Sequence, residues 1–179
     1  AQSGGLAILN LEGVYTRYED PYSQIREVIE SSSDEATPFL QKMYSAPIQE
    51  NLIGERVEEI KRMGCVSAVS VTPANTKRFA PVAAEAGADI IVIQSTVTTA
   101  RHISKSEKGL VISDICKELK VPVIVGNTVT YGATLELMDA GIQGVLVGVG
   151  PGAICTTREV VGVGVPQVTA CLLYTSPSP

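Results

Sequence analysis

Short apolar runs alternate with helix-like stretches along most of this chain. The runs at residues 5–11, 66–71, 88–94, 121–127 and 144–150 are short and rich in valine, isoleucine, leucine and alanine, so each predicts a buried strand. Polar residues do not alternate regularly with apolar ones in these runs, which indicates strands that are apolar on both faces. Such strands, separated by helices, are typical of a parallel sheet covered on both sides.

The stretches between the strands carry apolar positions at helical spacing. Residues 47–64 predict an amphipathic helix that ends at Gly64, and residues 130–141 predict another. Residues 74–87 predict a helix that is interrupted, or begins late, at Pro81. Residues 113–120 predict a short helix capped by Ser113.

Two α/β architectures fit this alternation: an open doubly wound sheet and a closed (β/α)8 barrel. Several predicted strands end in small or polar residues, namely Asn10, Thr72, Gln94, Asn127 and Gly150. A barrel shares its site among all its strand ends, whereas an open sheet concentrates it at one switch point, usually with a GxGxxG turn after the first strand. The first strand here has no such turn, so we expect a barrel.

Only about five of the eight βα units of a barrel are visible. Residues 1–170 are therefore predicted to form a partial (β/α)8 barrel, a single catalytic domain ending just after the 148–157 loop. Residues 171–179, which end in a run of Thr, Ser and Pro without helical period, are expected to be a non-native or disordered tail.

The composition narrows the possible partners. A chain of 179 residues with 45% hydrophobic and 18% charged residues is ordinary for a globular domain. A net charge of −5 argues against a nucleic-acid surface, and no apolar stretch approaches the roughly 20 residues of a membrane span. The first residues show no basic region followed by an apolar stretch, so a cytoplasmic location is expected.

The four cysteines match neither a zinc site nor a CxxC redox pair. Cys65, Cys116 and Cys171 are expected to be free thiols that behave as small buried hydrophobes. His102, the only histidine, lies in a polar stretch and is expected to be solvated.

Cys155 differs from the other three, because it follows three closely spaced glycines in GVGPGAICTT, residues 148–157. One interpretation is a tight turn with a buried cysteine. The other is a backbone cradle for a ligand or ion, because glycine lets the main chain turn inward without Cβ clashes. In that case the cysteine would be a nucleophile, which needs a lowered pKa or an adjacent base.

The loop resembles the active-site loop of the IMP dehydrogenase and GMP reductase family, whose signature is roughly G-x-G-x-G-S-x-C-x-T. Five positions match that signature: Gly148, Gly150, Gly152, Cys155 and Thr157. The following REVVGVGVPQ and the preceding VPVIVGNTVT are also similar to the family, and the resemblance runs from about residue 4 to residue 169.

The resemblance implies NAD-dependent oxidation of inosine 5′-monophosphate to xanthosine 5′-monophosphate. Cys155 would add to C2 of the purine, NAD would take the hydride, and Thr157 would assist near the hydrolytic water. The carbonyls of Gly150, Gly152 and Cys155 would hold a monovalent cation, usually potassium. The residues implied at the NAD site are Gln94, Ser95, Thr96, Gly148, Val149 and Gly150. Those implied at the purine nucleotide are Asn127, Ala153 and Cys155, and the whole protein would be a homotetramer.

Three positions depart from the broad family pattern. Ala153 stands where a serine usually contacts the phosphate, Leu146 replaces a usual Arg or Lys, and Gln94 replaces an Asp that binds the NAD ribose. Together with LNLEGVYTRYEDP and MYSAPIQ, they resemble a dehydrogenase-related subfamily that lacks paired CBS domains. Two alternatives stay open: a GMP reductase and a non-catalytic purine-nucleotide-binding paralogue.

Overall fold

Five parallel strands form one sheet in the computed structural model, which describes residues 1, 3–100 and 110–175. All five predicted strands are present, and they pair in chain order from β1 to β5. Their bounds are β1 Ile8–Asn10, β2 Ala68–Val71, β3 Ile90–Gln94, β4 Val123–Thr128 and β5 Gly144–Val147.

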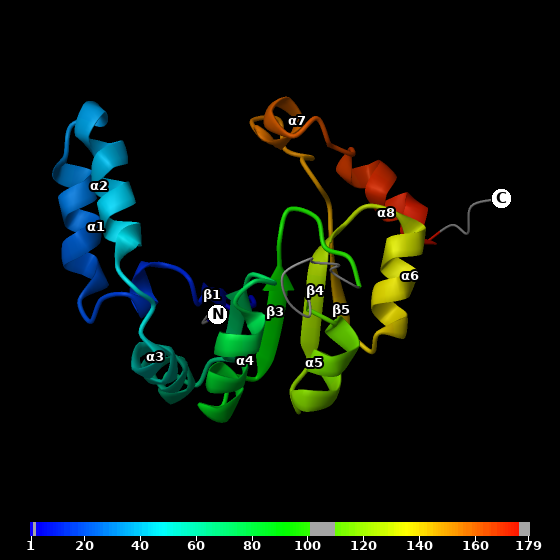
Figure 1. Cartoon of the computed structure of the whole chain (residues 1–179), viewed down its shortest axis with the longest axis horizontal. Helices are drawn as coiled ribbons and strands as arrows, with labels where there is room; N and C mark the ends of the chain where they lie inside the picture. The colour runs from blue at the N-terminus through cyan, green and yellow to red at the C-terminus, as the bar shows by residue number, and fades with distance from the viewer. Residues whose placement is uncertain (2, 101–109, 176–179) are drawn as a thin grey trace.

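The strand order favours the barrel over the doubly wound sheet. In a doubly wound sheet the order reverses at a switch point, and helices lie on both faces. Here each new strand is added on the same side of the one before it, with no reversal. Within the described residues β1 and β5 do not pair with each other, so the sheet is open and has the strand order of an incomplete barrel, as predicted (Figure 1).

Helices pack on one face of the sheet and build the core there. The covering helices are α3 Glu50–Arg62, α4 Thr76–Glu85, α5 Ile112–Glu118 and α6 Tyr131–Asp139. The strands contribute alternate residues to this core, and these residues are paired across the sheet: Val69 with Ile91, and Ile91 with Val123. Phe79 of α4 is the largest fully buried side chain. Among the described residues no helical layer covers the opposite face, so the expected helices on both faces are not found there. Val92 on that face is buried, whereas Ile90 and Ile124 are half-buried.

A helical hairpin between β1 and α3 was not predicted from the sequence. It consists of α1 Pro21–Glu30 and α2 Ser33–Ser45, which stand to one side of the sheet in Figure 1. Its cap signals are visible in the sequence: Asp20 accepts hydrogen bonds from the amides of Tyr22 and Ser23, and Pro21 occupies the first helical position. The last turn of α2 is bonded to the segment that follows the short 3-10 helix η1 Val14–Thr16, because the hydroxyl of Tyr18 donates to the carbonyl of Met43 (3.0 Å).

Two details of the predicted helices are wrong. Helix α4 runs without a break through Pro81, whose missing N–H costs one helical hydrogen bond while Phe79, Ala80 and Ala83 are buried against the sheet. Helix α5 begins at Ile112 with Val111 in the cap position, so Ser113 lies inside its first turn and is not the cap.

The end of the chain differs from the predicted tail. Helix α8 Gln167–Thr175 packs against β5 and α6, so residues 171–175 are helical, and the expected lack of helical structure there is wrong. Residues 176–179 lie outside the described residues. Among the described helices, none is both long and apolar enough to cross a membrane.

The cysteines are free thiols, as expected, but they are less buried than predicted. Cys65 and Cys116 are half-buried, and Cys171 is exposed. His102 lies outside the described residues.

Candidate active site

The carboxyl ends of the five strands meet at one edge of the sheet, because all the strands are parallel. Asn10, Thr72, Gln94 and Asn127 therefore lie along this edge, together with the glycine loop that follows β5. The predicted convergence of polar strand ends is confirmed.

The segment after β3 is tied to the end of β4. The amide of Ser95 donates to the carbonyl of Gly126 (2.9 Å), and the amide of Asn127 donates back to the carbonyl of Ser95 (3.0 Å). The buried hydroxyl of Thr98 also donates to the Gly126 carbonyl (2.6 Å). These bonds leave the side chains of Gln94 and Thr96 exposed at the edge, where a ligand can reach them.

The end of β4 is in turn joined to the glycine loop after β5. The side-chain amide of Asn127 donates to the carbonyl of Gly148 (2.9 Å), and the amide of Gly148 donates to the carbonyl of Thr128 (3.0 Å). Gly148 and Gly150 have φ angles of +125° and +59°, which favour glycine at both positions. Asn127, predicted to contact the purine, thus also fixes the turn that leads to Cys155.

Two residues predicted for ligand binding differ sharply in accessibility. Val149 is 2% exposed, and its carbonyl accepts from the amide of Val165 (2.9 Å), so it supports the loop from within. Ala153 is exposed at the tip of the loop and has no hydroxyl with which to bind a phosphate.

Cys155 and Thr157 are brought together at the start of the four-residue helix α7 Thr157–Val160. Sγ of Cys155 lies 3.4 Å from Oγ1 of Thr157, and both side chains are half-buried. The thiolate would accept a hydrogen bond from the hydroxyl of Thr157, which has the largest effect, and a second one from the backbone N–H of Thr157. The positive charge of Arg158 adds a weaker electrostatic attraction. Together they lower the pKa of the Cys155 thiol. This is the environment of a reactive cysteine.

Cys116 provides the opposite case, since burial alone raises the pKa of its thiol. The rate of alkylation follows the thiolate fraction, so Cys155 is expected to reach its maximal rate at a lower pH than Cys116 in the same protein. Pulse labelling with iodoacetamide across a pH series, read by mass spectrometry at each cysteine, measures both profiles. Thr157→Val should move the Cys155 profile to higher pH, and a Cys116 profile at lower pH than that of Cys155 would contradict the assignment.

One of the three carbonyls predicted to hold a monovalent cation, that of Gly152, is already engaged by the chain's own donors. The carbonyl of Gly152 accepts from the amide of Cys155 (3.1 Å) and from Nη2 of Arg158 (3.0 Å). A carbonyl oxygen has two lone pairs, and two N–H donors engage both of them. The neighbouring guanidinium would also repel a second cation.

Sequence reasoning missed a hydrogen-bonded carboxylate, Glu12, at the ends of β1 and β2. Glu12 accepts from the amide (2.7 Å) and the hydroxyl (3.0 Å) of Thr72, and also from the side-chain amide of Asn75. The available signal was an acidic residue directly after an apolar strand. Glu12 holds the turn that leads from β2 into α4.

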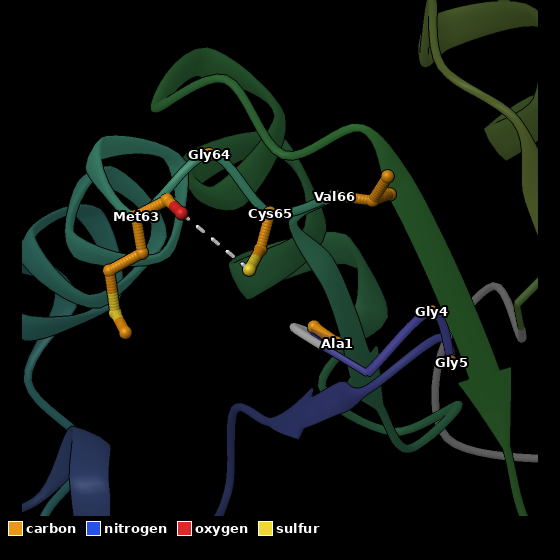
Figure 2. Close-up of a pocket in the computed structure, with 7 residues that line it drawn as sticks. All are labelled: Ala1, Gly4, Gly5, Met63, Gly64, Cys65 and Val66. Carbon is orange, nitrogen blue, oxygen red and sulfur yellow. Dashed lines mark hydrogen bonds between the residues drawn. The ribbon is translucent and has the colours of Figure 1, made fainter.

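A cavity of about 440 Å³ lies at the opposite end of the strands and is separate from this site (Figure 2). It is formed by the residues that precede β1 and β2, and the thiol of Cys65 points there toward the carbonyl of Met63 (3.8 Å). Its lining carries no carboxylate, imidazole or side-chain amide, so we assign it no chemistry.

Comparison with known proteins decides the family. A family model described as the IMP dehydrogenase / GMP reductase domain matches residues 1–176. The chain belongs to this family. A crystal structure of an IMP dehydrogenase/GMP reductase-like protein from Corynebacterium glutamicum superimposes with a TM-score of 0.83 at 34% identity, covering 94% of this chain and 44% of that one.

Two curated relatives show which kinds of protein in the IMP dehydrogenase / GMP reductase family this chain is similar to. An uncharacterized oxidoreductase of Mycolicibacterium smegmatis is 35% identical over 173 residues, which are 93% of this chain and 46% of the relative. An inosine-5′-monophosphate dehydrogenase of Cryptosporidium parvum is 49% identical over 86 residues, covering 48% of this chain and 20% of that enzyme. The chain thus spans under half the length of these relatives, and the family supports an oxidoreductase.

Proposed function

We propose that the protein containing this chain oxidises inosine 5′-monophosphate to xanthosine 5′-monophosphate, with NAD as hydride acceptor. The observation that carries the proposal is the pair Cys155 and Thr157, 3.4 Å apart on a glycine-rich loop at the carboxyl end of β5. A protein that only binds a nucleotide needs neither the thiol nor the hydroxyl at these positions.

In the proposed reaction, Cys155 performs two opposite steps at C2 of the purine. Its thiolate adds to C2 and forms a carbon–sulfur bond, and the hydride then leaves C2 with its electron pair to give a covalent thioimidate. Bound NAD would supply the acceptor for that hydride. A water molecule next adds to C2 and loses a proton, and the carbon–sulfur bond breaks to return the thiolate.

Thr157 serves both steps through its position beside the sulfur. When Cys155 is ionised, the hydroxyl and the backbone N–H of Thr157 stabilise the negative charge that is present before addition and again after release. The same hydroxyl would hydrogen-bond the hydrolytic water.

The groups at the ends of β3 and β5 fit the polar part of a dinucleotide. Gln94 is exposed and carries both an amide donor and a carbonyl acceptor for a ribose hydroxyl. As a neutral acceptor it would form weaker bonds than a carboxylate, since charge-assisted bonds are roughly twice as strong. We propose that Gln94, Ser95 and Thr96 bind the ribose side of NAD, and that the backbone of residues 148–150 lies under the nicotinamide side.

The test uses a protein that carries this chain together with the rest of its barrel. Inosine 5′-monophosphate and NAD are expected to give NADH absorbance and xanthosine 5′-monophosphate in equal amounts. Guanosine 5′-monophosphate with NADPH is the matched control reaction, and consumption of NADPH there without NADH formation in the first assay would make the protein a reductase. Nucleotide binding without turnover in either assay would make it a binding paralogue.

A further inference from the structure

Arg158 reaches back across the cysteine loop from the first turn of α7. Its side-chain stem passes over Gly164 and Gly150, which belong to two segments on either side of the helix. A Cβ at Gly164 would overlap with Cγ of Arg158 and lie 2.5 Å from its Cδ, and a Cβ at Gly150 would lie 3.2 Å from the Cγ. The absence of a side chain at Gly150 and at Gly164 therefore leaves room for the Arg158 side chain.

The guanidinium at the end of that path holds the backbone of the loop. Its Nη2 donates to the carbonyl of Gly152 (3.0 Å), and the same carbonyl accepts from the amide of Cys155 (3.1 Å). The oxygen therefore joins the charged side chain to the backbone of the reactive cysteine. A hydrogen bond from a charged donor is stronger than one between neutral groups.

We propose that Arg158 takes the structural place of a monovalent cation in this loop, so that the loop is organised by the chain's own positive charge. Arg158 is a positioning residue: it acts on Cys155 and Thr157 through the Gly152 carbonyl. The inference concerns the order of the loop, and it holds whether or not the proposed oxidation is correct.

Hydrogen exchange of the peptide covering residues 150–158 tests the proposal in a protein with the complete barrel. The wild-type peptide is expected to exchange at the same rate in KCl and in N-methylglucammonium chloride of equal ionic strength. In N-methylglucammonium, Arg158→Ala should exchange about three- to tenfold faster, the lower value reflecting the solvent exposure of Arg158. Potassium should slow that exchange again, because the substitution opens the Gly152 carbonyl to a cation.

Two further variants separate this role from a general loss of stability. Gly164→Ala leaves the charge in place but displaces the Arg158 stem, so it should also speed exchange of the loop. Arg62→Ala removes an exposed arginine at the end of α3 and should change nothing. Potassium protection of the wild-type loop, or unchanged exchange in Arg158→Ala, would overturn the proposal. Exchange is measured without substrate, so a protein that fails to oxidise inosine 5′-monophosphate can still pass this test.

Discussion

Replacing Cys155 with alanine is expected to abolish turnover of inosine 5′-monophosphate in the whole protein. The loss should exceed the roughly 10²- to 10⁴-fold typical of removing a positioned acid or base, because without the thiol no covalent intermediate can form. Steady-state NADH formation measures the effect. The Cys155→Ala variant is expected to keep nearly the stability of the wild type, because Cys155 is only half-buried.

A second test of the role of Cys155 uses the wild-type protein and does not depend on turnover. A 6-chloropurine nucleotide, an electrophilic analogue of the proposed substrate, should form its adduct on Cys155, and mass spectrometry of the digested protein locates it. Cys65→Ala is the matched control, since Cys65 lies at the opposite end of the strands. That variant should keep both turnover and labelling, and an adduct on Cys65 or Cys116 in the wild type would contradict the assignment of Cys155.

The 179-residue chain on its own is expected to aggregate or to remain loosely packed, and to turn over no substrate. A closed barrel has no sheet edges, whereas this sheet has two, at β1 and β5. Ile8 on β1 is 42% exposed, and every residue of β5 is only partly buried. Apolar surface left in water forgoes about 25 cal/mol per Å², while the entropy cost of ordering the chain is unchanged.

Light scattering after size exclusion, together with thermal melting, measures this behaviour. Ile8→Lys should reduce association, because a charged residue on an edge strand discourages pairing with a second copy. The matched control is Ile29→Lys, which changes an isoleucine on α1 that is 76% exposed and far from either sheet edge in the chain. A monodisperse wild-type chain that melts cooperatively would refute the prediction.

The positions of the strands along the chain could be predicted from the sequence because each strand has a local signal. Runs such as residues 88–94 are apolar over their whole length, and a buried parallel strand has that pattern. Cys155 could be singled out for a similar reason, since three glycines, a cysteine and a threonine stand within ten residues. The helical hairpin of α1 and α2 was missed because the stretch after the first strand was interpreted as a polar connection. Asp20 and Pro21 were nevertheless a local signal, and apolar residues recur at helical spacing at Ile25, Val28 and Ile29.

The sequence by itself determined the alternation of strands and helices, the cysteine loop and the family, because short-range patterns of burial and backbone freedom encode them. Only the tertiary structure placed Glu12 on Thr72, sixty residues away, and Arg158 over Gly164 with its guanidinium on the Gly152 carbonyl. Such contacts have no period along the chain. The Glu12 contact depends on the register of β1 and β2, which brings two distant segments together. The Arg158 contacts depend on how residues 150–164 fold back on themselves, and only the three-dimensional path of that loop determines this.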